Sequence, residues 1–497
     1  MTRTKRSVWN MLTGFLVAGL TLGSGFIGTP FVLRWLGGER FGVFRVLSDW
    51  FGYILLLDLG VIGSVEARLA PKFGAGDERG ALATLAAGLR IYLWISAVML
   101  AGGAALVLTL PYFLTLKTIP AQELRVAAWV LLIPVVWFPI SVFRALMEAR
   151  QRGYLVNLLL GSQALLTTAF LVLAARAGWG LVGQAAATTL ALAPTPAILL
   201  WMGLRHYRTV LTLPPDPAAM AELRALNWPT FWFNISGRFG LLSDNIVIGF
   251  FLGPLAVAPF FLTQRLAQLA QGQLQGIGNS TWAGLVELHA QGQTRRFCDR
   301  MTELTTLISG AGLAVLGPIA AYNQHFIRLW VGQSYYGGHW VTAIACINIW
   351  MWAISSLWGW PISGSGNIAS MVPYAIAFTV LNVSASVLGV LTVGLPGPLL
   401  GTFAAFVLIN SWGMPRVLSR IFAPELRNIW QAALRPLAWG LPYAILLWWV
   451  AQRQAPLGWL GLGVQGALAG LGGLVLWWLN LQSAARQEWK LRLRLLT

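Results

Sequence analysis

Residues 91–110, IYLWISAVMLAGGAALVLTL, decide the class of protein, because they form a run of twenty residues with no charged side chain. A helix of about twenty apolar residues spans the hydrocarbon core of a bilayer. Similar runs recur along the 497-residue chain, which is 57% hydrophobic and only 10% charged. Soluble domains carry about a quarter charged residues. The composition therefore excludes an ordinary soluble enzyme and predicts a polytopic membrane protein.

The chain has fourteen apolar segments, one of which contains this run, and they predict an all-α protein with about 14 transmembrane helices. Backbone hydrogen bonds must be satisfied internally in lipid, and the strands of a β-barrel would be shorter and alternating. The basic start Arg3-Thr4-Lys5-Arg6 is similar to a signal peptide, but the apolar run after it is too long, so we interpret it as a retained first helix. The segments are 8–33, 42–68, 87–110, 126–147, 154–176, 180–204, 229–252, 255–287, 301–322, 340–362, 371–394, 398–418, 430–451 and 457–480.

The basic residues between these segments are distributed asymmetrically. With the N-terminus inside, 24 Lys and Arg residues fall in inner loops and 7 in outer loops. Cytoplasmic loops carry such an excess, so we predict that both termini are cytoplasmic. The net charge of +18 therefore marks topology and does not indicate nucleic-acid binding. The two cysteines, Cys298 and Cys346, support neither a disulfide framework nor a zinc site.

The chain also matches itself when it is shifted by 216 positions, which aligns Leu36-Gly37 with Leu252-Gly253 and Gly76 with Gly292. The shift carries the first six segments onto the next six in the same order. We therefore predict two parallel six-helix pseudo-repeats plus two C-terminal helices. The predicted domains are an N-lobe at 1–204, a cytoplasmic linker at 205–228, a C-lobe at 229–418, and two further helices with a cytoplasmic tail at 419–497.

Polar side chains are concentrated in segments 42–68, 229–252 and 255–287. An ionisable residue in the bilayer costs roughly 2.5–3.5 kcal/mol on insertion scales, and such residues usually face a cavity or each other. We interpret these side chains as the lining of a hydrophilic cavity between the lobes. The predicted substrate-binding residues are Arg45, Asn234, Arg238, Gln264, Arg265, Gln268, Gln271 and Gln275, and the coupling or gating candidates are Asp49, Asp58 and Asp244.

Each of these residues also has a structural interpretation. Arg45 and Asp49 are four apart and can form an ion pair private to one helix face. Asp58 can cap a helix break, and Asp244 can bond backbone at the lobe interface. The other two arginines can snorkel toward a membrane interface, and a row of glutamines can join two helices.

The proposed cavity lining favours one kind of substrate. Guanidinium groups suit phosphate oxygens, and glutamine amides offer the donors and acceptors that sugar hydroxyls need. A pyrophosphate-linked glycan with a lipid tail matches both. None of the four lysines follows the glycine of a nucleotide-binding P-loop. We therefore predict a transporter with no catalytic residues, no metal site, no cofactor and no ATP site.

Several motifs resemble those of a known family. They are Leu36-Gly37 followed by Phe41-Gly42, then Leu57-Asp58-Leu59-Gly60, Gly74-Ala75-Gly76, and above all SDNIVIGFFLGPLAV at 243–257. In this order they resemble the polysaccharide transporter branch, with its Wzx-type O-antigen flippases, of the multidrug/oligosaccharidyl-lipid/polysaccharide exporter superfamily.

The resemblance implies alternating access, with an undecaprenyl-pyrophosphate-linked oligosaccharide moved from the cytoplasmic to the outer leaflet of a bacterial inner membrane for surface polysaccharide such as lipopolysaccharide O-antigen. It implies cationic cavity residues on the first, second, seventh and eighth transmembrane segments. Arg45, Arg238 and Arg265 match this pattern on the second, seventh and eighth segments. The first segment departs from it, because it has no charged residue and offers only Asn10 and Ser24. The expected partners are the lipid-linked glycan, membrane lipid and polysaccharide polymerase machinery, but no nucleic acid. Coupling to a proton or monovalent-cation gradient is left open.

Three other functions compete with this one. The first is a cation-coupled multidrug or small-solute antiporter of the same superfamily, for which acidic cavity residues are expected. The second is a membrane enzyme acting on lipid-linked sugars, although the outer loops carry only Glu39 and Glu123 as carboxylates. The third is a scaffold that transports nothing, in which neutral substitutions of the cavity arginines would have no effect.

Overall fold

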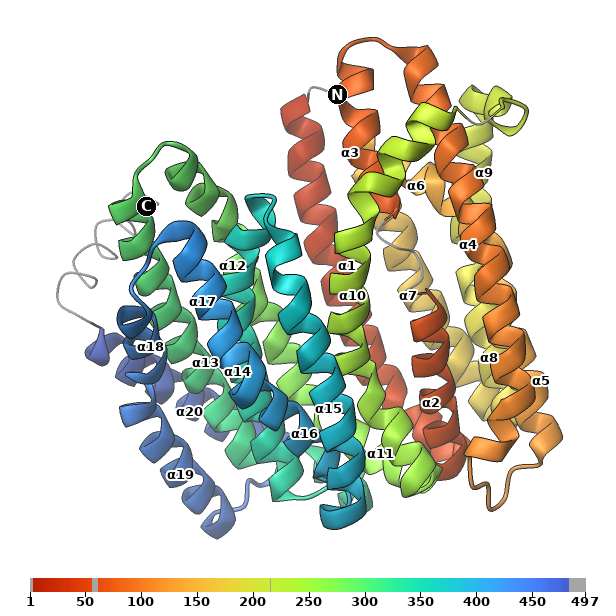
Figure 1. The fold of residues 1–497 in the computed structure, drawn as a ribbon. Coiled ribbons are helices and arrows are strands. Elements are labelled where there is room, and N and C mark those ends of the chain that lie inside the picture. The colour runs from red at the N-terminus through yellow and green to blue at the C-terminus, as the bar shows by residue number, and fades with distance from the viewer. Residues whose placement is uncertain (1–2, 56–60, 215, 482–497) are drawn as a thin grey trace. The chain divides into compact units, whose positions relative to one another are not determined.

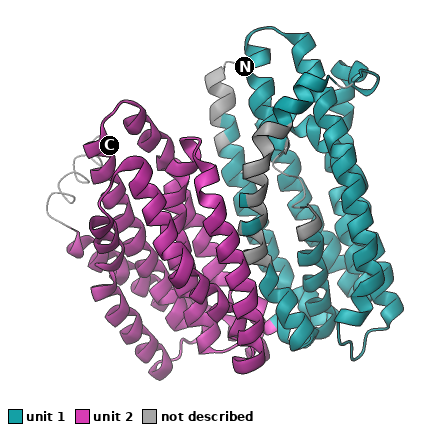
Figure 2. Ribbon diagram, viewed as in Figure 1, with its two compact units in different colours: residues 1–258 teal, residues 259–497 magenta. Residues whose placement is uncertain are grey.

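A computed structural model describes residues 3–55, 61–214 and 216–481, and every regular element in these ranges is helical (Figure 1). The predicted all-α class is therefore confirmed. The helices form two compact units, residues 1–258 and 259–497 (Figure 2). Each unit is described by itself below.

In the described residues of unit 1 there are ten α-helices and part of an eleventh. The turns η2 (Ile133–Ile140) and η3 (Arg208–Leu211) are 3₁₀ helices. The α-helices are α1 (Arg3–Leu36), α2 (Gly38–Leu55), α3 (Val61–Gly74), α4 (Glu78–Phe113), α5 (Ala121–Leu132), α6 (Ser141–Ala149), α7 (Gly153–Arg176), α8 (Gly180–Leu192), α9 (Pro194–Tyr207), α10 (Pro217–Phe251) and the start of α11 (Pro254–Thr263).

Unit 2 begins within α11. It includes the 3₁₀ turns η4 (Gln333–Tyr335) and η5 (Ile368–Met371) and the π-helical turn η6 (Phe406–Asn410). Its other helices are α12 (Arg265–Ala290), α13 (Thr294–Trp330), α14 (His339–Gly364), α15 (Val372–Val393), α16 (Gly397–Ala405), α17 (Ser411–Phe422), α18 (Leu426–Leu434), α19 (Leu437–Arg453) and α20 (Gly458–Asn480).

Where the structure describes them, the predicted apolar segments coincide with helix, although some are divided. Within the described residues, ten helices are long and apolar enough to cross a membrane. Of the other segments, 255–287 and 430–451 are each split between two helices, and 42–68 includes residues 56–60, which the structure does not describe. The remaining segment, 229–252, corresponds to the later part of α10 and contains several of the predicted site residues.

The outer surfaces of the helices are apolar, as expected for helices in lipid. Large hydrophobic side chains such as Trp94, Tyr112 and Leu460 are 75–82% exposed. Several buried side chains are polar, among them Gln184, Asn323 and Asn382. Asn323, for example, donates to the backbone carbonyl of Thr263 and to the hydroxyl of Thr342, so polar contacts join helices in the interior.

The first turns of α10 occupy part of the stretch 205–228 that we assigned to the linker. Asp216 caps this helix, because its carboxylate accepts from the backbone N–H of Ala218 at 3.0 Å. Proline is well tolerated at the first helical position, so Pro217 begins the helix instead of prolonging the loop. Because α10 packs against α2, α3 and α4, it belongs to unit 1.

The backbone confirms the sequence repeat at its turns. Left-handed residues end corresponding helices at Gly37 and Gly253 (φ +83° and +85°), at Gly76 and Gly292 (+72° and +70°), and at Gly178 and Gly394 (+75° and +74°). Each of these pairs is 216 positions apart, as the sequence shift predicts. A fourth pair, Gln151 and Gly366 (+59° and +80°), is 215 apart. Such residues close helices by accepting a conformation that glycine adopts without strain.

Candidate functional site

The central polar contact of unit 1 starts on α2. Arg45 and Asp49 are one helical turn apart, and the Arg45 Nη2 atom lies 2.6 Å from Asp49 Oδ1. The Asp49 side chain is almost fully buried, whereas Arg45 remains 31% exposed. The ion pair that we considered as the structural interpretation of these two residues is therefore formed.

A second helix completes this contact. From α10, Asn245 Nδ2 donates to Asp49 Oδ2 at 2.7 Å, so the two carboxylate oxygens of Asp49 take donors from different helices. We call Arg45, Asp49 and Asn245 the α2–α10 clasp. A buried charge must be paired and hydrogen-bonded, and the clasp meets this requirement for Asp49.

Asp244 lies beside the clasp, next to Asn245 in the chain. It is only 9% exposed and interacts electrostatically with Asp49. Among the described residues, neither Asp244 Oδ1 nor Asn245 Oδ1 has a hydrogen-bond partner. When both carboxylates are ionised, this group of residues has two negative charges and one positive charge. The arrangement can therefore take up one further cation or proton.

Three predicted site residues cannot be placed. Asp58 lies outside the described residues. Asn234 and Arg238 lie on α10, but the described residues do not include their side chains. Their roles stay predictions.

In unit 2, Gln264 and Arg265 lie where α11 ends and α12 begins, so this predicted segment is not one continuous helix. Gln264 is buried, and its amide donates to the carbonyl of Phe260 at 3.3 Å. The guanidinium of Arg265 lies over the ring of Phe261, 5.7 Å from its centroid. Both side chains thus contact the preceding turn of α11.

The other three glutamines follow one face of α12 and are half-buried. Gln275 donates to Ser356 Oγ on α14 at 3.3 Å, which is the helix-joining role that we weighed for this row. No hydrogen bond within the described residues defines a role for Gln268 or Gln271. The cavity between the lobes remains a prediction, because it depends on residues of both units.

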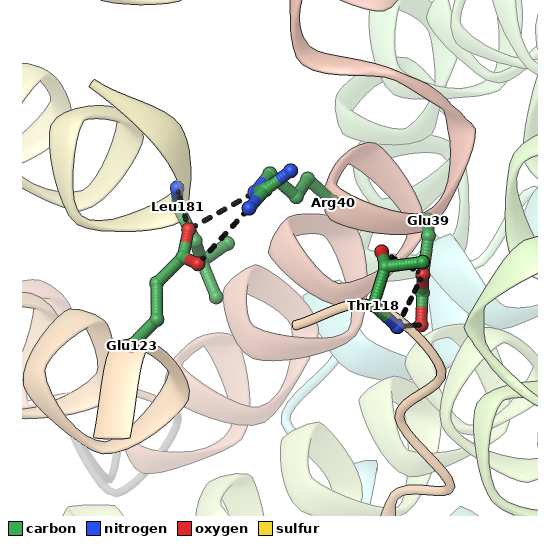
Figure 3. A network of polar contacts seen from close by, with 5 residues as sticks. All are labelled: Glu39, Arg40, Thr118, Glu123 and Leu181. Atoms are coloured by element: carbon green, nitrogen blue, oxygen red, sulfur yellow. Dashed lines mark hydrogen bonds and ion pairs between the residues drawn. The ribbon is translucent and has the colours of Figure 1, made fainter. Parts of the chain in front are cut away.

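A further polar cluster, at the α1–α2 end of unit 1, was not predicted (Figure 3). Arg40 binds both carboxylate oxygens of Glu123 at 3.1 and 3.2 Å, and Glu123 also accepts from the backbone N–H of Leu181 at 2.7 Å. Glu39 accepts from the hydroxyl and the backbone N–H of Thr118. The cluster joins α2 to the loop before α5 and to the start of α8. In the sequence, Arg40 is one of the seven basic residues of the outer loops and carries no other signal.

Hydrogen bonds determine the charge state of Glu39. Burial by itself raises the pKa of this carboxyl, but the Thr118 hydroxyl, the backbone N–H groups of Lys117 and Thr118, and the charge of Arg40 together lower its pKa below the ordinary value. Glu39 is therefore a structural anion at neutral pH.

Among the described residues, no group of three or more His, Cys, Asp or Glu side chains has the geometry of a metal site. The chemistry that the described polar groups can perform is charge pairing and hydrogen bonding. This chemistry can hold a charged solute or a proton.

Comparisons with known proteins identify a family that the sequence of this chain matches. Residues 7–283 match the sequence profile of a family described as polysaccharide biosynthesis proteins. A curated relative, the probable multidrug resistance protein NorM of Deinococcus radiodurans, is 32% identical over 291 residues. This match covers 50% of the present chain and 62% of the relative, so the chain spans less than two thirds of that protein's length.

Solved structures share the fold. The lipid II flippase MurJ in an inward closed conformation superposes with a TM-score of 0.66 at 11% identity and covers 95% of this chain and 98% of its own. An inward-facing multidrug resistance MATE family transporter of the MOP superfamily superposes with a TM-score of 0.63 at 16% identity and covers 92% and 100%. At these identities the likeness concerns the fold alone.

Proposed function

Because the chain belongs to the family of polysaccharide biosynthesis proteins, within the multidrug/oligosaccharidyl-lipid/polysaccharide exporter superfamily, we propose that it is a flippase for lipid-linked oligosaccharide. The chain is a multi-pass membrane transporter of this superfamily. The proposed cargo is a polyprenyl-pyrophosphate-linked oligosaccharide, which the protein moves from the cytoplasmic to the outer leaflet of the bacterial inner membrane by alternating access. The exported glycan serves surface polysaccharide such as O-antigen.

The observation that carries this proposal is the family match over residues 7–283, which is more than half of the chain. The charge of the predicted site agrees with it. Arg238 and Arg265 are cations suited to a pyrophosphate, whereas Arg45 is ion-paired with Asp49, and the glutamines of α12 supply amides for sugar hydroxyls. An inside-negative potential favours outward movement of the anion by roughly 2.3 kcal/mol per charge per 100 mV.

The proposal includes an orientation. The excess of Lys and Arg in alternate loops favours cytoplasmic N- and C-termini. The α3–α4 and α6–α7 turns then face the cytoplasm, where the lipid-linked glycan is assembled. Polysaccharide polymerase machinery on the opposite side is the proposed partner.

Resetting of the empty transporter is the step that needs a driving force. We assign it to Asp49 and Asp244, because this group of residues has an excess negative charge that one proton or monovalent cation neutralises. Uptake of the ion on one side and its release on the other would couple the conformational change to the ion gradient.

A second candidate is a cation-coupled multidrug or small-solute antiporter. Two observations favour it: the relative in Deinococcus radiodurans is named a probable multidrug resistance protein, and Asp244 is a buried acidic residue with an unpartnered oxygen among the described residues. The two candidates differ in the sign of their cargo, since the flippase carries an anion and the antiporter a cation.

One genetic experiment separates them. The gene is deleted, and lipid-linked oligosaccharide on the inner leaflet, surface polysaccharide and sensitivity to cationic drugs are measured. The flippase predicts accumulation of the lipid-linked intermediate and loss of surface polysaccharide with unchanged drug sensitivity. The antiporter predicts the reverse.

Complementation then tests the site. Arg265→Ala and Arg238→Ala should fail to restore surface polysaccharide, whereas Arg79→Ala, which removes an exposed arginine of the α4 start, should restore it. Membrane levels of each variant are measured as the expression control. Full restoration by both site variants would remove these arginines from the cargo site.

A further inference from the structure

Unit 1 contains a pocket that the transport proposal does not use. It has a volume of about 500 Å³ and lies between the turn that joins α3 to α4 and the turn that joins α6 to α7. Its charged lining residues are Glu78, Arg150 and Arg152, and Phe73 adds an aromatic ring. Volumes of about 300–1,000 Å³ are typical of small-ligand sites.

Polar contacts fix both walls of this pocket. In the α3–α4 turn, Lys72 Nζ donates to Thr84 Oγ1 at 2.6 Å and to the carbonyl of Gly80 at 3.2 Å. The carboxylate of Asp77 caps α4 by accepting from the Gly80 N–H at 2.8 Å. On the other wall, Asn10 Oδ1 accepts from the N–H of Tyr154 at 2.5 Å, in the first turn of α7. Hydrogen bonds within the protein therefore hold both turns that line the pocket.

Arg150 is held in place by aromatic rings. Its guanidinium carbon lies 4.8 Å from the ring centroid of Phe73 and 4.9 Å from that of Tyr207, and it donates to the Tyr207 hydroxyl. These contacts hold the Arg150 guanidinium beside the pocket, whose lining includes both Arg150 and Arg152. Arg152 and Glu78 also interact electrostatically with the Tyr207 hydroxyl. Two cations and one anion thus lie close enough to the Tyr207 hydroxyl to interact with it.

The repeat shows that the turn itself does not require these arginines. The equivalent turn of unit 2 is Ser365-Gly366-Asn367, which has the same left-handed central residue and the same closing bond. Asn367 N–H donates to the Ile362 carbonyl at 3.1 Å, as Arg152 N–H donates to the Met147 carbonyl at 2.8 Å. Neutral residues therefore build this turn equally well.

Topology alone also does not account for the arrangement. A positively charged inner loop requires only that arginines be present, whereas the Arg150 guanidinium contacts two aromatic rings beside the pocket. In addition, Gln151 occupies a left-handed conformation (φ +59°) where glycine would be unstrained.

We propose that this pocket binds a phosphate group carried by a lipid of the cytoplasmic leaflet. The position of the pocket at the cytoplasmic face rests on the orientation in the proposed function. Its affinity for a phosphate group depends only on the residues that line it. Guanidinium groups recognise phosphate oxygens with charge-assisted hydrogen bonds, and Arg150 and Arg152 bring two of them to this pocket. An anionic phospholipid and the diphosphate of a lipid-linked cargo share this chemistry.

Binding to the purified full-length chain in neutral detergent tests the proposal. The probes are dioctanoyl phosphatidylglycerol, dioctanoyl phosphatidylcholine as the zwitterionic control, and inorganic pyrophosphate as a competitor. We expect phosphatidylglycerol to bind more tightly than phosphatidylcholine, and its affinity to fall as salt is added.

Two variants with opposite expected effects locate the site. Arg152→Gln should weaken phosphatidylglycerol binding by roughly tenfold, and Glu78→Gln should tighten it, because the first removes an attractive charge and the second a repulsive one. Arg79→Gln and Glu222→Gln make the same charge changes on exposed residues that do not line the pocket. These controls should stay within about twofold of the wild type. Thermal unfolding of each variant confirms that it folds.

The competitor distinguishes the source of the phosphate. Displacement of phosphatidylglycerol by pyrophosphate supports a site that also accepts the cargo diphosphate, and a lack of displacement supports a phospholipid site. Equal binding of both lipids, or equal effects of Arg152→Gln and Arg79→Gln, would overturn the proposal. Since this assay needs no transport, it can fail while the flippase stands, and the genetic experiment can fail while the pocket stands.

Discussion

The α2–α10 clasp allows a stability prediction with a worked magnitude. The perturbation is Asn245→Ala, combined with Asp49→Ala in a double-mutant cycle. A hydrogen bond to an ionised group contributes about 1.5–3 kcal/mol, whereas interhelical hydrogen bonds in membranes average about 0.6 kcal/mol and reach about 1.7. Asp49 is 2% exposed and its bond to Asn245 is 2.7 Å long. We therefore expect a coupling free energy of about 1.5 kcal/mol, close to the membrane maximum.

The assay is unfolding of the purified protein in mixed micelles with increasing SDS, followed by tryptophan fluorescence. The control cycle uses Arg68 and Glu222, which also join α10 to a neighbouring helix of unit 1 but lie 3.4 Å apart with side chains 40% and 50% exposed. Such a surface pair should show a coupling below about 1 kcal/mol. If the clasp couples no more strongly than this surface pair, the argument that burial makes Asp49 an anchor for α10 is refuted.

Three further predictions follow from the same structure. Glu39→Gln should lower the thermal unfolding midpoint at neutral pH. Because the folded-state pKa of Glu39 is lowered, the extra stability of the wild type is fully present above the ordinary pKa of 4.5 and is lost as the pH falls through the lowered pKa. A difference in midpoint between wild type and variant that grows in acid would contradict the assignment. Gly42→Ala should destabilise by about 1–3 kcal/mol, since a Cβ there would lie 1.9 Å from the Pro254 carbonyl oxygen; Gly63→Ala, with open space around it, is the control, and equal stability of the two would disprove the close contact. Asp244→Asn should abolish the dependence of transport on an ion gradient in proteoliposomes while the protein still folds, and unchanged gradient dependence would exclude Asp244 as the coupling residue.

Much of the fold could be predicted from local sequence. The length of each apolar run and the absence of water in a bilayer leave helix as the only solution, and each predicted segment coincides with helix in the part of the chain that the structure describes. The repeat was also readable, because glycines that end helices in a left-handed conformation recur 216 residues apart. Sequence could not show where long segments divide. The separation of α11 from α12 at Gln264 occurs inside a continuous apolar and amide-rich stretch, where no local signal ends the helix.

The candidate site was predictable only as a set of residue types. Helical spacing offered the ion pair between Arg45 and Asp49 as one of two interpretations, since residues four apart share a face, and the structure contains this pair. The bond from Asn245 to Asp49 joins residues 196 positions apart, and no periodicity encodes such a distance. For the same reason, Arg40 and Arg150 were interpreted as topology markers. Only the packing of helices brings Glu123 to the first and Phe73 and Tyr207 to the second.

The sequence by itself thus determined that this protein is a membrane-embedded, duplicated helical bundle. The signals for its helices and turns are hydropathy and turn residues, which act between residues only a few positions apart. Only the tertiary structure determined which charges are paired and which carboxylate oxygen, that of Asp244, has no hydrogen-bond partner among the described residues. Electrostatic energy depends on distances in space between side chains and on their burial, and both arise only when α2 meets α10.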